Sequence, residues 1–309
     1  MADPIPYILR GVRPVATESS LLVSSSKYLN SARMRDWLAM ICLRRNGPDF
    51  PLPAELHEMV LLLHELQDRD RIEGLFREER RTNPRLNAWF EEEYYSPRLT
   101  AAEYRRYPTG TVGYVLSQQY GDDFETEIAS EQWEPASTQY DFYRRRQIQS
   151  HDLEHVLTGG GLDALGELVP AYFRMANLPR FINNQELAGE MCTIHVLASL
   201  RYTVRTMLHY PQVWTHCLDA IQRGTVAGAT SDALFLQKPE SLLGLPLDEA
   251  RAAIGLRDVV DRDTSEASAF WEGRRETPPA PLPAAHEPRP QGAFLRTREH
   301  IDGDLKEAS

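Results

Sequence analysis

The sequence predicts an all-α fold organised as a single helical domain, and three observations support this. Apolar residues recur mostly at intervals of three and four from about residue 31 onward, which is the spacing of one helix face. Strand-type alternation of apolar and polar residues is scarce throughout. The length of 309 residues and the hydrophobic content of 42% are enough for one substantial core or two small ones.

The first two predicted helices each carry an apolar face. One face comprises Met34, Trp37, Leu38 and Ile41, and the other comprises Leu56, Met59, Val60, Leu63 and Leu66. A turn-rich loop at 46–53 separates the helices, and Pro53 suits the first turn of the second one. The charge run at 78–81 is typical of a solvated helix face, which Asn83-Pro84 ends.

The segment 99–120 predicts two shorter helices. Thr100 is a good N-cap and Glu103 follows three residues later, which is the capping-box pattern. We expect this first helix to run to about Tyr107, where the Pro-Thr-Gly sequence at 108–110 stops it. The second helix occupies the rest of the segment.

Further helices are predicted in the second half of the chain. The longest pattern, 138–157, ends at three consecutive glycines, 159–161, each of which would cost about 1 kcal/mol inside a helix. Another helix is expected to begin near Asp163 and to continue past Glu167 to about Met175. The remaining helices are predicted at about 185–207, 212–223 and 247–254.

The composition of the chain changes near its C-terminus. After Asp261, prolines cluster among scattered charges with few apolar anchors, and such a segment cannot bury enough surface to offset the cost of ordering it. We therefore expect residues 1–20 to form an N-terminal extension, 21–261 the helical domain and 262–309 a disordered proline-rich tail.

Charge and composition argue against several classes of protein. Lys and Arg number 34 against 45 Asp and Glu, and the resulting net charge of −11 disfavours a nucleic-acid binder, which needs a basic footprint. No apolar stretch approaches the ~20 residues of a spanning helix. Three cysteines without CxxC spacing indicate neither a disulfide scaffold nor a thiolate zinc site. Without a recognisable secretory signal, we expect a cytoplasmic location.

Four residues predict a metal site between two adjacent helices. On a helix, His151 and His155 lie one turn apart and Asp152 is three residues before His155, so all three can project from one side. The glycine turn allows the next helix to fold back antiparallel, which would bring Glu167 to the same point. Because the set combines imidazole nitrogens with carboxylate oxygens, it suits one divalent ion such as Zn, Fe, Co or Mn.

Two other metal enzymes fit the His-Asp-Leu-Glu-His run less well. A metalloprotease helix needs Glu next to the first His as general base, whereas Asp152 stands there. A phosphohydrolase of the HD type would need a separate upstream His and a downstream Asp ligand, and neither can be assigned. Each of the other histidines that we considered, His57, His64, His195, His209 and His216, can be interpreted as a polar residue on a helix face.

The four residues resemble the metal motif of the ubiquinone (coenzyme Q) biosynthesis protein family called Coq-four: His-Asp, two residues, His, eleven residues, Glu. The eleven residues here are 156–166. Further similar segments are the Tyr-Pro-Thr-Gly-Thr-Val-Gly sequence at 107–113, Gly166-Glu167, Leu178-Pro179 and Ile254-Gly255-Leu256. The likeness is diffuse from about residue 20, firm from about 99 to 180, and stops near Arg257. Where the family usually carries Arg-Tyr-Arg before the motif, this chain has Arg146, Gln147 and Ile148.

The resemblance implies a mainly α fold whose metal site opens toward an apolar channel for a polyprenyl tail. The activity it implies is oxidative C1 decarboxylation and hydroxylation of a polyprenylated 4-hydroxybenzoate-type precursor, with Asp152 and Glu167 as candidate catalytic residues. There are two alternatives. One is a non-catalytic scaffold or prenyl-lipid-binding component among other quinone-biosynthesis proteins, and the other is a metal-dependent enzyme that acts on another aromatic substrate. Peripheral membrane association is also implied, and a homo-oligomer is a further option.

Two segments are candidates for contact with such a substrate. Arg144, Arg145 and Arg146 could clamp a carboxylate, although a solvated basic face is the more ordinary interpretation. The helix at about 190–207 has apolar residues spread too widely around its axis for one narrow core stripe. One of its sides could line a tail channel or meet a membrane, and the alternative is a central helix buried all round.

Overall fold

The computed structural model describes residues 23–46, 52–119 and 134–282, and within these residues the fold is all-α. The α-helices are α1 Lys27–Asn30, α2 Ala32–Leu43, α3 Leu52–Leu66, α4 Arg69–Thr82, α5 Pro84–Glu92, α6 Ala101–Tyr104, α7 Val112–Gln119, α8 Gln139–Thr158, α9 Leu168–Asn177, α10 Gln185–His209, α11 Trp214–Thr230, α12 Leu247–Ala253 and α13 Ser265–Trp271. No strand occurs in the described ranges, where an isolated bridge joins Thr111 to Pro246. The predicted fold class is confirmed.

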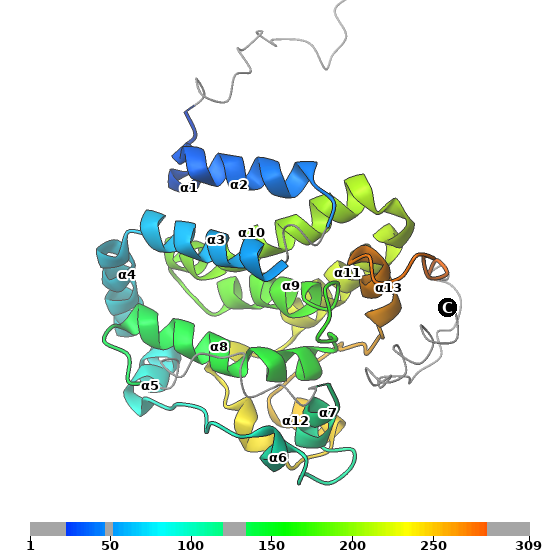
Figure 1. Cartoon of the computed structure of the whole chain (residues 1–309). Helices are drawn as coiled ribbons and strands as arrows, with labels where there is room; N and C mark the ends of the chain where they lie inside the picture. The colour runs from blue at the N-terminus through cyan, green and yellow to red at the C-terminus, as the bar shows by residue number, and fades with distance from the viewer. Residues whose placement is uncertain (1–22, 47–51, 120–133, 283–309) are drawn as a thin grey trace, which may run out of the picture.

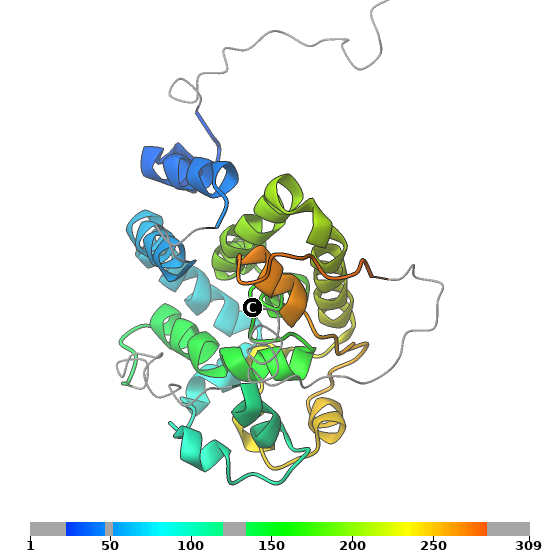
Figure 2. The same ribbon diagram turned by 45° about the vertical axis from the view of Figure 1, so that its right-hand side comes forward.

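The helices are arranged around α8, α9 and α10. Both ribbon views place α1 and α2 at one end of the molecule and α6 and α12 at the opposite end (Figures 1 and 2). Buried side chains of α10 join hydrophobic clusters shared with α4 and α5, with α11 and α13, and with α2 and α3. Helix α10 therefore connects most of the core. Among the described residues, no helix is both long enough and apolar enough to cross a membrane.

Helix α9 is held closely against α11 by two glycines one turn apart on α11. A Cβ atom at Gly224 would lie 2.3 Å from the backbone oxygen of Val169, and one at Gly228 would lie 2.4 Å from that of Phe173. Because any larger residue would push the helices apart, these glycines set the position of α9. Helix α9 in turn carries part of the site described below.

Local sequence signals account for several helix ends. Thr100 and Glu103 form the predicted capping box: the Thr100 backbone N–H donates to the Glu103 carboxylate over 2.8 Å, and the Glu103 N–H donates to Thr100 Oγ1 over 3.3 Å. Helix α6 ends at Tyr104, earlier than predicted. Helix α8 ends where the glycines begin, with Gly159 in the left-handed conformation at φ 82°.

Residues of the charge run at 78–81 lie near the end of α4, and one of them is buried. The Glu79 carboxylate accepts hydrogen bonds from the backbone N–H groups of Asn183 and Asn184, over 2.8 and 2.9 Å. Its side chain therefore fixes the loop before α10 instead of facing solvent. Helix α5, which begins directly afterwards at Pro84, was not predicted.

Residues 262–282, predicted to belong to a disordered tail, are part of the described structure. Helix α13 lies within them, and its Trp271 is 0% exposed, packed on the rings of Tyr202 and Tyr210 at centroid distances of 5.2 and 6.0 Å. One large aromatic side chain with a core position offsets the cost of ordering this short segment. The rest of the predicted tail, 283–309, lies outside the described residues, as does the N-terminal extension at 1–20.

Helix α9 also begins later than predicted, at Leu168 instead of near Asp163. The Asp163 carboxylate accepts hydrogen bonds from the Gly166 N–H over 3.0 Å and from the Thr264 hydroxyl over 2.8 Å. These bonds hold 163–166 as a turn under α13. Glu167 is consequently the residue that precedes α9, not one inside it.

Candidate metal centre

Helix α8 presents two imidazoles on one face. His151 and His155 are one turn apart, and their ring centroids are separated by 4.7 Å. His155 is fully buried and His151 is partly exposed. The predicted one-sided arrangement of the two histidines is confirmed.

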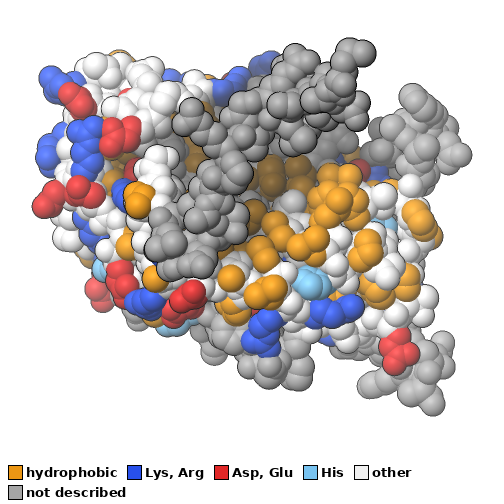
Figure 3. Space-filling view, turned by 90° about the horizontal axis from the view of Figure 1, so that it is seen from above, with side chains coloured by type: hydrophobic (Ala, Val, Ile, Leu, Met, Phe, Trp, Pro, Cys, Tyr) orange, Lys and Arg blue, Asp and Glu red, His pale blue; other side chains and the backbone are white. Residues whose placement is uncertain are grey.

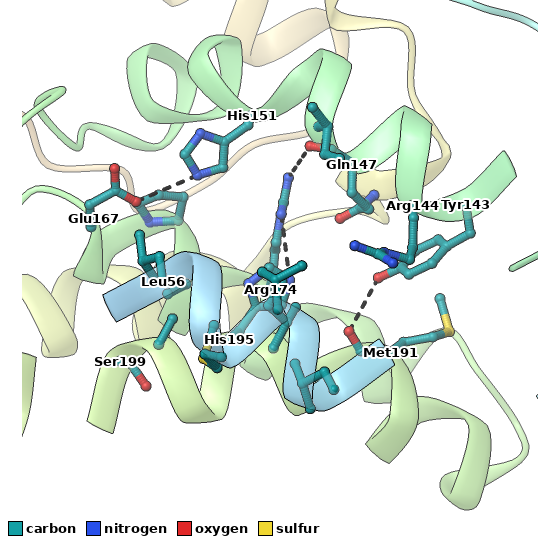
Figure 4. A pocket seen from close by; sticks show the side chains of 18 of the residues that line it. Leu56, Tyr143, Arg144, Gln147, His151, Glu167, Arg174, Met191, His195 and Ser199 are labelled. Atoms are coloured by element: carbon teal, nitrogen blue, oxygen red, sulfur yellow. Dashed lines mark hydrogen bonds and ion pairs between the residues drawn. The ribbon is translucent and has the colours of Figure 1, made fainter. Parts of the chain in front are cut away.

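The turn after α8 brings Glu167 to these rings. A Cβ atom at Gly166 would lie 2.1 Å from the backbone oxygen of Gly161, so the segment can close this tightly only with glycine at that position. The Glu167 Oε2 atom then lies 3.5 Å from Nε2 of His151 and 3.5 Å from Nε2 of His155. Figure 4 shows the His151 imidazole pointing toward the Glu167 carboxylate.

The spacing of these three groups suits a small divalent ion. One ligand atom from each residue lies within 4.8 Å of the others. Ligands bound at about 2.1 Å around a tetrahedral ion are roughly 3.4 Å apart, close to the two 3.5 Å separations. The structure thus brings together three of the four predicted ligands.

The fourth predicted ligand, Asp152, contacts the other nitrogen of His151. Its Oδ1 atom lies 3.1 Å from His151 Nδ1, on the side of the ring away from Glu167. A carboxylate in this place orients a ligating imidazole and raises its basicity. Asp152 also lines the cavity described below.

His155 is held in the tautomer that a metal ligand needs. Its Nδ1 atom lies 2.8 Å from the backbone oxygen of Gly161, which can only accept, so Nδ1 carries the proton and donates it. In the neutral ring the lone pair is then on Nε2, which is buried and has no hydrogen-bond partner in the described parts of the chain. A buried nitrogen without a partner that faces a carboxylate and a second imidazole fits an ion ligand.

Charge coupling shifts the pKa values of the site in opposite directions. Burial lowers the pKa of His151, but Glu167 and Asp152 outweigh it and raise this pKa to about 10. Burial raises the pKa of Glu167, but the two histidines outweigh it and hold this pKa well below its usual range. Without an ion, His151 and Glu167 are therefore a charged pair at pH 7.

A cavity of about 420 Å³ extends from this cluster between α3, α8, α9 and α10. Its polar end includes His151, Asp152 and Glu167, whereas α3 supplies four aliphatic or thioether side chains to the lining: Leu56, Met59, Val60 and Leu63. An elongated amphiphile with a polar head and an apolar chain would match this distribution.

Two residues without a predicted role also line the cavity, Arg174 of α9 and His195 of α10. Arg174 is buried and pairs with Glu154 at 2.6 Å. Arg174 Nη1 lies 3.4 Å from His195 Nε2, which must accept, and burial, Arg174 and His151 keep the pKa of His195 well below its usual range. His195 is thus neutral. In the sequence, each of these residues is a polar residue in a mostly apolar segment of its helix.

The three arginines of α8 do not form one clamp. Only Arg144 lines the cavity, and no ion pair of Arg144 occurs among the described residues. The partly exposed Arg145 side chain donates to the backbone oxygen of Glu134. Arg146 is buried and pairs with Glu240 at 2.7 Å, away from the cavity lining, because consecutive residues of a helix point in different directions. The predicted clamp is therefore wrong for Arg145 and Arg146.

Helix α10 lines the cavity on one side and has exposed apolar side chains elsewhere on its surface. Its Met191, Ile194 and Ala198 line the cavity, while Val196 and Met207 are 48% and 53% exposed. The alternative of a helix buried all round is therefore wrong. The view from the α1–α2 end of the molecule shows hydrophobic side chains gathered there (Figure 3).

Binding of a divalent ion at neutral pH is expected to release about one proton per ion. His151 holds a proton at pH 7 because its pKa is raised to about 10, and this proton must leave before Nε2 can bind an ion. Ion affinity should accordingly rise with pH up to about that value. Titration calorimetry in buffers of different ionisation enthalpy measures the number, and a value near zero at pH 7 would contradict the His151–Glu167 pair.

Comparison with solved structures finds a similar fold. A crystal structure of a candidate ubiquinone biosynthesis protein from Nostoc punctiforme superposes with a TM-score of 0.52 at 19% sequence identity, covering 72% of this chain and 94% of the other. At this identity the similarity concerns the fold. No protein-family model and no curated protein matches the chain, so the resemblance to the Coq-four family stays a prediction.

Proposed function

We propose that this protein catalyses a metal-dependent step of ubiquinone biosynthesis, acting on the head group of a polyprenylated 4-hydroxybenzoate-type precursor. The observation that carries the proposal is the cluster of His151, His155 and Glu167, of which His151 and Glu167 line a cavity whose walls are largely apolar. The fold similarity to a candidate ubiquinone biosynthesis protein supports the same pathway. The proposed reaction is oxygen-dependent: the C1 carboxylate leaves as CO2, one atom of O2 becomes the hydroxyl oxygen at C1, and a two-electron donor reduces the other atom to water.

The residues of the cavity divide the work of binding. His151, His155 and Glu167 would hold one divalent ion, which would supply a Lewis acid and, if redox-active, a site for oxygen chemistry. Arg144 offers a cation without an ion pair among the described residues, and it would bind the substrate carboxylate. The aliphatic side chains of α3 would enclose the first part of the prenyl chain and exclude water from the ring.

Partners and location belong to the same proposal. A prenylated substrate resides in a bilayer, so the protein would contact the membrane surface, for which exposed apolar side chains such as Met207 are available. Contact with other quinone-biosynthesis proteins and homo-oligomerisation stay predictions.

The proposal is tested by a Glu167→Gln variant in a strain that lacks the endogenous step. Quinone output is expected to fall about a hundredfold or more, with accumulation of the carboxylated precursor, because one of three ligands loses its charge. Glu249→Gln, the same change on the exposed face of α12, should leave output unchanged. Mass spectrometry of lipid extracts measures both compounds.

A non-catalytic scaffold gives a different result. Normal quinone output from an Asp152→Ala, Glu167→Ala double variant that remains folded would exclude metal catalysis. Weakened association with other quinone-biosynthesis proteins, without loss of turnover by the purified protein, would favour the scaffold. Turnover of another aromatic acid in place of the prenylated one would support a metal-dependent enzyme with a different substrate.

A further inference from the structure

Gln147 is a buried amide that lines the cavity and has no internal partner. It lies on α8 one turn before His151 and is 7% exposed. Neither its Nε2 nor its Oε1 atom has a hydrogen-bond partner in the described parts of the chain. Figure 4 shows the side chain beside Arg174 and Arg144, within the ring of residues that surround the cavity.

Two other buried amides, Gln149 and Asn177, have hydrogen-bond partners. Gln149, two residues later on the same helix, accepts from the Ser96 N–H over 3.0 Å and from Arg146 over 3.0 Å. Asn177 donates to the backbone oxygens of Gly228 and Asp232, each over 3.0 Å. A buried amide without partners is costly, and the place of Gln147 in the cavity wall indicates that its partner is a ligand.

The backbone at Gln147 is held by a side chain of the neighbouring helix α9. The Gln147 backbone oxygen accepts a hydrogen bond from Arg174 Nη2 over 3.0 Å, and Arg174 is itself paired with Glu154 at 2.6 Å. The backbone that carries the amide is therefore positioned by α8 and α9 together. Such support from neighbouring elements is what a binding residue needs in order to discriminate.

The neighbours of Gln147 restrict what it can bind. Along α8 it lies between Arg144 and His151, each about one helical turn away, on the same side of the helix. An anionic group of the ligand would bind more favourably beside Arg144 or at the metal site. The group that reaches Gln147 is therefore an uncharged one on the ring between them.

We propose that Gln147 is a specificity-determining residue that hydrogen-bonds a hydroxyl group on the ring of the ligand. An amide offers one acceptor and two donors, and a hydroxyl both donates and accepts, so it can satisfy Oε1 and Nε2 together. A ring without the hydroxyl leaves the amide unsatisfied in a dry site, which is the situation that produces strong discrimination. This inference rests on the proposed function in one respect, that the ligand is an aromatic ring with an apolar chain.

The test is equilibrium binding of two probes to the metal-loaded full-length protein: 3-geranyl-4-hydroxybenzoate and 3-geranylbenzoate. The wild type is expected to bind the hydroxylated ring about ten- to a hundredfold more tightly. Gln147→Met, which has a similar length but no strong hydrogen-bonding atoms, should reduce that ratio to about one and leave the affinity for 3-geranylbenzoate unchanged or higher. Gln147→Glu should keep part of the preference because a carboxylate still accepts from the hydroxyl.

Two controls separate this role from the metal site and from folding. Gln222→Met makes the same change on the exposed face of α11 and should leave the ratio at the wild-type value. The metal content of Gln147→Met should equal that of the wild type. A wild-type ratio in Gln147→Met would overturn the inference while leaving the metal-dependent function standing.

If the wild type binds neither probe, the proposed substrate is contradicted, and the role of Gln147 is tested by a second measurement. That measurement is the melting temperature of the wild type and of Gln147→Met without ligand. A temperature in Gln147→Met that equals or exceeds the wild-type value is expected for an amide whose partner is external. A fall of several degrees would show that the amide is structural and would overturn the inference.

Discussion

Replacing His155 by alanine is expected to reduce the bound metal from about one ion per chain to nearly none. His155 is fully buried, and its Nε2 atom faces Glu167 at 3.5 Å while its Nδ1 atom is fixed by Gly161. Removal of one ligand from a three-residue site should cost more than the ~10- to 100-fold in affinity that loss of an outer-shell partner costs. Elemental analysis of the purified protein measures the metal content.

The control for this prediction is His64→Ala, the same change on the exposed surface of α3. It should leave the metal content unchanged. Because His155 is buried, a His155→Gln variant, which fills more of the site, guards against a loss of metal caused by unfolding. Equal metal content in the wild type and in both His155 variants would contradict the assignment of the site.

Replacing Arg146 by alanine is expected to lower the free energy of unfolding by about 3–5 kcal/mol. The Arg146 guanidinium lies 2.7 Å from Glu240 and also donates to Ser96 and Gln149, and it is 2% exposed. Its removal leaves the Glu240 carboxylate buried without its counter-ion, which is the costly situation in a low-dielectric interior. Urea denaturation followed by circular dichroism measures the change.

Arg144→Ala is the matched control, two residues earlier on the same helix. Arg144 is partly exposed, so its removal should change the free energy of unfolding by no more than about 0.5 kcal/mol. It should instead weaken binding of an aromatic carboxylate, because Arg144 lines the cavity. Weakened carboxylate binding in a stable Arg146→Ala protein would contradict the structural role given to Arg146.

Much of the helical framework was predictable from local sequence. The capping box at Thr100, the end of α8 at Gly159 and the shared face of His151 and His155 depend on residues within about four positions of one another. The glycines at 159–161 also indicated correctly that the chain reverses toward Glu167. These rules concern neighbours along the chain, so a single sequence is sufficient to apply them.

Predictions that depended on composition alone were less accurate. The segment after 262 has a proline-rich composition, yet Trp271 anchors α13 in a pocket formed with Tyr202 and Tyr210. Asp163 has the features of a helix N-terminus, but Thr264 of the same late segment keeps it in a turn. A single distant partner decided the local structure in each case.

The sequence by itself determined the all-α class, most helices and three of the residues of the candidate metal site. Only the tertiary structure decided which charged and polar groups face the cavity. Arg146 and Glu240 are 94 residues apart, and Arg174 meets Gln147 from another helix, so no local periodicity links them. The physical reason is that burial makes the free energy of a charge or an amide depend on the nearest partner in space, whatever its position in the chain.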